Sequence, residues 1–124
     1  MTKTYKISEV ATMTGLSIPT LRYYETLGLL KPVRQENNYR LFTDKELNWI
    51  EFIKRAKATG MPLAKIMTYA KLREQGHETI KARIAILGQQ EQILHEEQEK
   101  IQGHIDFLQK KKQYYEQLTA KNEA

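Results

Sequence analysis

The sequence predicts a mainly α protein, in which a winged helix-turn-helix domain is followed by one long helix. Two short amphipathic segments meet at Gly15, and two extended segments within residues 33–42 flank a polar turn. An apolar repeat of about 3.5 residues then runs through the last third of the chain. We therefore expect two domains, residues 1–75 and residues 76–124.

The first helix is expected over residues 8–13, with Ser8 as its N-cap. Gly15 suits the tight turn that follows, because glycine adopts the left-handed backbone conformation without steric cost. Ser17 then caps a second helix, and Pro19 falls in its first turn, where a missing N–H costs little. Together these segments form the predicted helix-turn-helix.

The second helix is predicted to bury one face and to expose another. Leu21 and Tyr24 are three residues apart and face inward, which leaves Arg22 and Tyr23 outside. Gly28 ends this helix. Exposed arginine beside aromatic rings suits a negatively charged polymer with flat bases.

A β-wing is predicted after the second helix. Extended segments at residues 33–34 and 39–42 are separated by residues 35–38, where Asn38 tolerates the positive φ of a hairpin turn.

The third and fourth helices are bounded by a capping box and by glycines. Thr43 and Glu46 begin the third helix, Gly60 ends it, and Gly76 ends the fourth. The side chains at core spacing in these helices are Trp49, Phe52, Met61 and Met67.

The last helix carries apolar residues in alternating steps of four and three, which is typical of a coiled-coil seam. At 1.5 Å per residue, a helix of ~40 residues is about 60 Å long and needs a partner helix to bury this seam. A second copy of the chain is the simplest partner. The predicted dimer-interface residues are Ile80, Ile84, Leu87, Leu94, Ile101, Ile105, Leu108 and Tyr115.

The composition places the positive charge in the first part of the chain. Residues 1–75 hold 13 Lys and Arg against 7 Asp and Glu, whereas residues 76–124 hold 7 against 8. The absence of cysteine excludes disulfides and thiolate metal sites. Without a signal peptide or an apolar run of about 20 residues, we expect a soluble, cytoplasmic protein.

These residues resemble the MerR family of bacterial transcription regulators over nearly the whole chain. The matching positions are Ile7-Ser8-Glu9-Val10-Ala11, Gly15-Leu16-Ser17, Thr20-Leu21-Arg22-Tyr23-Tyr24-Glu25, Gly28-Leu29, Pro32, Arg34 and Tyr39-Arg40-Leu41. Gly76, Thr79-Ile80 and Tyr114-Tyr115 are similar to the small aldehyde-responsive branch of that family.

Three positions depart from the family pattern. Members of that branch often carry a sensing cysteine in the third helix, and residues 53–56 contain none, so thiol-based sensing is not expected. Asn38 stands where the wing turn usually has glycine, and Phe42 stands where the wing usually has tyrosine. Both changes are expected to preserve the wing.

The resemblance implies a homodimer, paired through antiparallel long helices, on double-stranded promoter DNA. Arg22 and Arg40 would make bidentate contacts with phosphates or guanine edges, and Tyr23 and Tyr39 would contact phosphates or sugars. The further DNA-binding candidates are Lys6, Thr20, Tyr24, Arg34, Lys54 and Lys57, for which a solvated surface or, for Tyr24, the core is the competing interpretation.

The resemblance also implies that the dimer distorts an overlong promoter spacer so that RNA polymerase engages both promoter elements. No separate effector domain is expected, because the sequence stops at Ala124. An unknown small effector at the junction of the fourth and last helices, and no effector at all, both stay open.

Other functions remain as alternatives. A non-switching repressor or architectural protein of the same fold is the first. A metal sensor or enzyme is disfavoured, because His77, His95 and His104 lack ligand spacing and no catalytic motif is present, so neither catalysis nor a cofactor is expected. A coiled-coil adaptor is disfavoured by the basic, aromatic first half.

Overall fold

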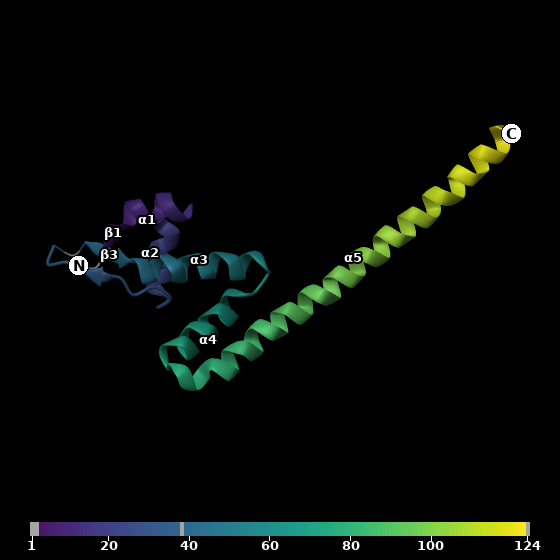
Figure 1. Ribbon diagram of the computed structural model, residues 1–124. Coiled ribbons are helices and arrows are strands. Elements are labelled where there is room, and N and C mark those ends of the chain that lie inside the picture. Colours follow the sequence, from purple (N-terminus) through teal and green to yellow (C-terminus); the bar gives the residue numbers. More distant parts are fainter. Residues whose placement is uncertain (1–2, 38, 124) are drawn as a thin grey trace. The chain divides into compact units, whose positions relative to one another are not determined.

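The computed structural model describes residues 3–37 and 39–123. The elements in chain order are β1 (Thr4–Lys6), α1 (Ile7–Thr14), α2 (Ile18–Thr26), β2 (Val33–Arg34), β3 (Arg40–Thr43), α3 (Asp44–Ala58), α4 (Leu63–Glu74), the 3-10 turn η1 (His77–Thr79) and α5 (Ile80–Glu123) (Figure 1). The chain divides into two compact units, residues 1–83 and residues 84–124. The predicted fold class, a winged helix-turn-helix followed by a long helix, is confirmed.

Helix α1 begins one residue earlier than the sequence predicts. Its N-cap is Lys6, so the prediction that Ser8 caps this helix is wrong. Strand β1 leads directly into the helix, and the backbone N–H of Lys6 donates to Oε1 of Glu9 over 3.0 Å. Because Glu9 supplies the capping oxygen from within the first turn, no serine cap is required there.

The turn between α1 and α2 follows the prediction. Gly15 has φ of 77°, and its N–H donates to the carbonyl of Ala11 over 2.9 Å. Ser17 is the N-cap of α2, where its Oγ accepts from the backbone N–H of Thr20 over 3.2 Å. Pro19 lies in the first turn of α2, as expected.

The wing belongs to a three-stranded antiparallel sheet with the order β1-β3-β2. Strand β1 was not predicted, because three residues with a single aromatic carry too little pattern to identify a strand. Tyr5 in β1 lies opposite Phe42 in β3, and its hydroxyl donates to Oδ1 of Asp44 over 2.8 Å. That hydrogen bond raises the pKa of Tyr5. Phe42 is buried, so its ring occupies the core without a hydroxyl.

The core of the first unit lies between the sheet and helices α1 to α4. Thr43 caps α3, where its Oγ1 accepts from the backbone N–H of Glu46. The largest fully buried side chains are Phe42, Leu21, Leu30, Ile50, Ile53, Ile66 and Val10. Of the four side chains predicted at core spacing, Trp49 and Met61 are buried, whereas Phe52 and Met67 are half-buried. Phe52 nevertheless stacks on Trp49, with ring centroids 5.3 Å apart.

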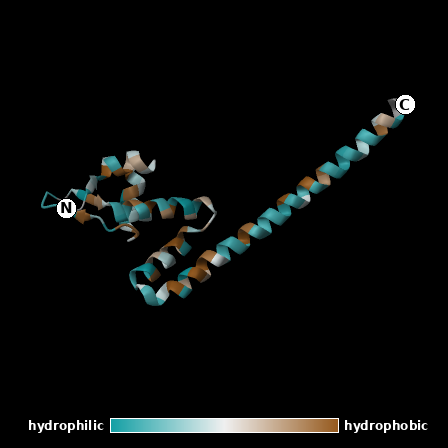
Figure 2. Ribbon diagram, in the orientation of Figure 1, coloured by the Kyte–Doolittle hydropathy of each residue, from teal (hydrophilic) through white to brown (hydrophobic). Residues whose placement is uncertain are grey.

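Helix α5 runs without interruption from Ile80 to Glu123 (Figure 1). Its entry is braced by the guanidinium of Arg83, which donates to the carbonyl of Gly76 over 3.0 Å and to Oγ1 of Thr79 over 3.1 Å. The helix continues through Gly88 and Gly103. Apolar positions recur along its length between hydrophilic ones (Figure 2).

Candidate nucleic-acid interface

Helix α2 exposes two of its four residues that the sequence assigns to DNA binding. Its cap at Ser17 fixes where the helix begins, and the helical period then turns Leu21 and Tyr24 into the core. Arg22 and Tyr23 lie between these buried positions and are exposed. An exposed guanidinium and an exposed phenol thus share the outer side of one short helix.

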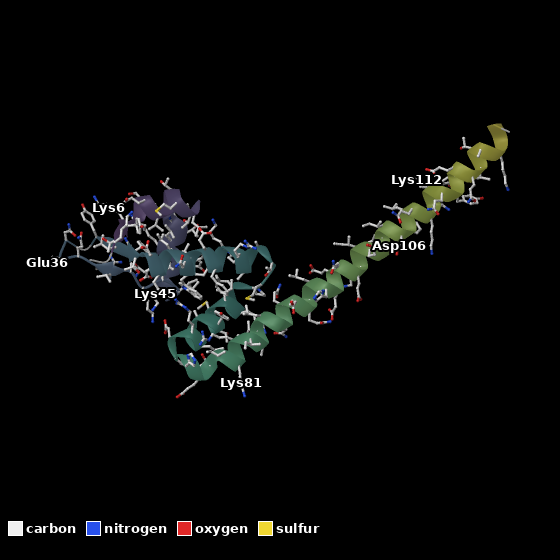
Figure 3. The ribbon with its side chains drawn as sticks, in the orientation of Figure 1. Lys6, Glu36, Lys45, Lys81, Asp106 and Lys112 are labelled. Carbon is white, nitrogen blue, oxygen red and sulfur yellow. The ribbon has the colours of Figure 1, made fainter. Side chains whose placement is uncertain are left out.

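Four of the predicted DNA-binding residues come together around one surface hollow. The hollow is lined by Lys6, Ile7, Ser8, Arg22, Tyr39 and Arg40. These residues come from the β1–α1 junction, from α2 and from the wing, which are distant in the sequence. Lys6 lies close to the wing in the first unit (Figure 3). Three cations and a phenol at one concave site form a surface suited to an anionic ligand.

Strand β1 explains how Lys6 reaches this hollow. Successive side chains of a strand point to opposite faces, so Tyr5 and Lys6 leave β1 in opposite directions. Tyr5 binds Asp44 at the beginning of α3, and Lys6 lines the hollow on the other side. The alternation Thr4-Tyr5-Lys6 was the only sequence signal for this placement, and it is short.

The wing places two arginines directly opposite each other. The β2–β3 register pairs Arg34 with Arg40, and the backbone N–H of Gln35 donates to the carbonyl of Tyr39 over 2.9 Å at the turn. Both guanidinium groups bind the carboxylate of Glu25, which lies in the last turn of α2. The turn residue Asn38, predicted to adopt positive φ, lies outside the described residues.

Glu25 is a residue of this surface whose role the sequence analysis missed. Nη2 of Arg34 lies 2.5 Å from Oε1 of Glu25, and Nε of Arg40 lies 3.1 Å from each carboxylate oxygen. An isolated glutamate near the end of a helix resembles any solvated acidic residue, so only the three-dimensional contacts reveal its two partners.

The two lysines of α3 that are predicted to bind DNA have partners within the domain. Nζ of Lys54 donates to the backbone carbonyl of Thr14 at the end of α1 and lies 3.6 Å from Oε1 of Glu51. Nζ of Lys57 donates to the hydroxyl of Tyr24 over 3.2 Å. These contacts attach α3 to the helix-turn-helix, which accounts for both lysines without DNA. Their DNA contacts stay predictions.

Tyr24 and Thr20 are the least accessible candidates on α2. The Tyr24 residue is 3% exposed, so its ring serves the core, and its hydroxyl accepts from Nζ of Lys57. Thr20 is half-buried, and its Oγ1 lies 2.8 Å from Oγ of Ser17 at the helix cap. A DNA contact from either residue also stays a prediction.

Helix α5 presents a second candidate surface. All eight side chains of the predicted seam are exposed in the single chain, including Ile84 at 61% and Leu108 at 63%. Phe107, Tyr114 and Leu118 are exposed on the same helix. Charged side chains such as Asp106 and Lys112 stand along it (Figure 3). Large apolar side chains repeated at helical spacing are the pattern of a helix that packs against another helix.

The described residues contain neither a metal-binding group nor a membrane-spanning helix. Histidine, cysteine, aspartate and glutamate form no group of three or more that is arranged to hold a metal ion in residues 3–37 and 39–123. Over the same residues, no helix combines the length and hydrophobicity that a membrane span requires.

Comparison with known proteins identifies the family. The model of the MerR HTH family regulatory protein matches residues 5–72, and the model described as MerR, DNA binding matches residues 47–111. An uncharacterised HTH-type transcriptional regulator of Haemophilus influenzae is 33% identical over 94% of this chain and 87% of its own length. The regulator AdhR of Bacillus subtilis is 38% identical over 71% of this chain and 64% of its own length, so the alignment leaves more than a third of AdhR unmatched.

Solved structures agree with the family models. The crystal structure of HiNmlR, a MerR family regulator lacking the sensor domain and bound to promoter DNA, matches with a TM-score of 0.72 and 32% identity, over 84% of this chain and 80% of that chain. A regulator from Listeria monocytogenes matches with a TM-score of 0.78 and 30% identity, over 90% of this chain and 86% of that chain. This chain is therefore a member of the MerR family of helix-turn-helix regulatory proteins.

Proposed function

We propose that this protein binds double-stranded promoter DNA as a homodimer and controls transcription from that promoter. The observation that carries the proposal is the gathering of Lys6, Arg22, Tyr39 and Arg40 around one hollow beside α2. The likeness to HiNmlR, whose crystal structure contains promoter DNA, supports it. Residues 1–75 would form the DNA-binding domain, and residues 76–124 would form the dimerisation helix.

In the proposed complex, α2 enters the major groove and the wing contacts the flanking backbone. Arg22 makes a bidentate contact with a guanine edge or a phosphate, because the planar guanidinium matches both. Tyr23 and Tyr39, both more than half exposed, supply hydroxyl groups to phosphates. The remaining backbone contacts would come from Lys6, Thr20, Tyr24, Arg34, Arg40, Lys54 and Lys57.

We infer that α5 of one chain pairs antiparallel with α5 of a second chain. The helix has 44 residues, which corresponds to about 66 Å, and its eight seam side chains are exposed in the single chain. Burying them against a second copy removes this apolar surface from water. Each Å² of apolar surface buried stabilises the dimer by about 25 cal/mol. The pair would then present two DNA-binding domains to one duplex.

The transcriptional mechanism that we propose is distortion of an overlong promoter spacer, which lets RNA polymerase engage both promoter elements. Such deformation costs on the order of 1–10 kcal/mol and is offset by additional backbone contacts. A small effector would bias the dimer between two DNA shapes. The second candidate function is a repressor that does not switch, and the absence of cysteine favours it over thiol-based sensing.

DNA binding is tested by fluorescence anisotropy with the duplex found upstream of the gene, at several salt concentrations. We expect tight binding to that duplex, weaker binding to a scrambled duplex of equal length, and a steep fall in affinity with salt. Equal affinity for both duplexes, or an affinity that does not change with salt, would contradict the proposal.

The mechanism is tested by transcription in vitro from the native promoter and from a copy whose spacer is shortened to the ordinary length. Activation by distortion requires that the protein stimulate the native promoter and lose that effect on the shortened one. Repression of both promoters would favour the non-switching function. The same assay with and without an added aldehyde shows whether an effector of that class acts on this chain.

A further inference from the structure

We propose that Glu25 is a positioning residue, whose carboxylate holds Arg34 and Arg40 in the orientation in which the wing meets a DNA phosphate. An acidic side chain on a DNA-binding surface would then strengthen binding instead of weakening it. This inference rests on the proposed function, since it assigns a role within the same surface.

The sheet register creates the need for such a group. Arg34 and Arg40 are direct cross-strand partners in the β2–β3 hairpin. Like charges opposite each other in a sheet repel and destabilise the pairing. A carboxylate between the two guanidinium groups removes that repulsion, and Glu25 supplies it from α2, with Nη2 of Arg34 at 2.5 Å and Nε of Arg40 at 3.1 Å.

The position of Glu25 is unfavourable unless its partners are present. It lies in the last turn of α2, where the helix dipole disfavours a negative charge. It also lies on the side of the domain where the wing would meet phosphates. Helix formation therefore gives no reason for a carboxylate at this place, whereas the two arginines do.

The cluster is less exposed to solvent than an ordinary surface ion pair. The side chains of Glu25 and Arg40 are 20% and 22% exposed, and that of Arg34 is 37% exposed. A single exposed pair contributes little, but here two guanidinium groups share one carboxylate, and both Glu25 and Arg40 are partly buried. The contact also spans 15 residues of sequence, so it attaches the wing to the helix proposed to enter the groove.

The geometry leaves Arg40 able to bind a phosphate. Its contacts with Glu25 use Nε alone, and the two terminal nitrogens of the guanidinium take no part in them. The same side chain lines the hollow with Arg22 and Tyr39. Glu25 thus fixes one edge of the Arg40 guanidinium, while Arg40 still lines the site. Fixing the guanidinium in advance lowers the entropy that is lost when a ligand binds.

The decisive comparison is between Glu25→Gln and Glu36→Gln. Both substitutions remove one negative charge and keep the side-chain size, and Glu36 lies at the tip of the wing (Figure 3). If charge alone mattered, both variants would bind the upstream duplex more tightly. The proposal expects Glu25→Gln to bind roughly fivefold to tenfold more weakly, and Glu36→Gln to bind as well as the wild type or better.

The same substitution in a variant without the two arginines tests why Glu25→Gln loses affinity for DNA. In the double variant Arg34→Ala with Arg40→Ala, Glu25 has lost both partners and is only a repelling anion. Adding Glu25→Gln to it is therefore expected to tighten binding, which reverses the sign of the effect. A loss of similar size in both backgrounds would show that Glu25 acts through folding alone and would overturn the proposal.

A measurement on the wild-type protein covers the case in which Glu25→Gln does not fold. In nitrogen-15 NMR spectra of the free protein, the Nε–H of Arg40 is expected to be shifted and protected from exchange with water. An averaged, rapidly exchanging signal would overturn the proposal.

These experiments can refute the proposed function and the role of Glu25 separately. If the wild-type protein did not bind the duplex, the proposed function would be refuted. Wild-type protein that binds the duplex, beside a folded Glu25→Gln variant that binds equally or more tightly, would refute only the role of Glu25.

Discussion

The indole N–H of Trp49, in α3, donates a 2.8 Å hydrogen bond to the backbone carbonyl of Leu29, in the segment that follows α2. Both residues are buried. The bond joins the segment after α2, the helix proposed to enter the groove, to α3, the longest helix of the first unit. The carbonyl of Leu29 needs such a donor, because a buried acceptor without a partner is costly.

Replacement of Trp49 by Phe is expected to lower the free energy of unfolding by about 1–3 kcal/mol, since it leaves this carbonyl unpaired. Urea denaturation followed by far-UV circular dichroism, at one fixed protein concentration, measures the change. Tyr69→Phe is the matched control, because it keeps the ring that stacks on Phe52 and Trp49 and is expected to cost less than about 0.5 kcal/mol. Equal stability of Trp49→Phe and wild type would contradict the importance of the bond.

Ser17→Ala is expected to destabilise the protein by about 1 kcal/mol, because it removes the oxygen that caps α2. Ser8→Ala removes a hydroxyl from the first turn of α1, where Glu9 supplies the capping oxygen, and is expected to change stability by less than about 0.5 kcal/mol. Thermal unfolding of the two variants without DNA distinguishes the cap from the serine that only resembles one. A larger loss for Ser8→Ala would reverse the assignment.

Leu94→Asp is expected to dissociate the homodimer, because it places a charge at the middle of the predicted seam. Sedimentation velocity measures the result as a shift from dimer to monomer. Gln113→Asp adds the same charge to an exposed position of α5 outside the seam and is expected to leave the dimer intact. If both variants remained dimeric, the pairing would use another face of the helix.

Arg22→Ala is expected to weaken binding to the upstream duplex by about 1–3 kcal/mol, as for the loss of a bidentate contact. Lys45→Ala removes the same charge from a different hollow, lined by Trp49 and Arg73 among others, and is expected to have a smaller effect. Anisotropy titrations at one salt concentration compare the two variants. Equal losses would indicate that Arg22 acts only through the net charge of the domain.

The sequence was sufficient for the elements whose boundaries carry chemical signals. Gly15 ends α1, Ser17 begins α2 and Thr43 begins α3, and the structure places all three in the expected turn and caps. The same logic failed at Ser8, because a capping group can also come from within the first turn, and Glu9 provides it. Local residue types predict that a cap exists more reliably than which side chain forms it.

What the sequence did not predict depends on contacts between distant segments. Strand β1 is three residues long and is defined by its register with β3, so it has no periodicity of its own. Glu25 meets Arg40 only after the wing folds against α2. The exposed positions of Arg22 and Tyr23 were predictable from the helical period, whereas the meeting of Arg22 with Lys6 around a hollow required β1.

The most direct test of the account is the number of chains bound to one copy of the upstream duplex, measured by native mass spectrometry or sedimentation equilibrium. We expect two chains per duplex, bound in a single cooperative step and released together as the salt concentration rises. One chain per duplex, or a chain that remains monomeric and does not bind the duplex, would contradict the central claim.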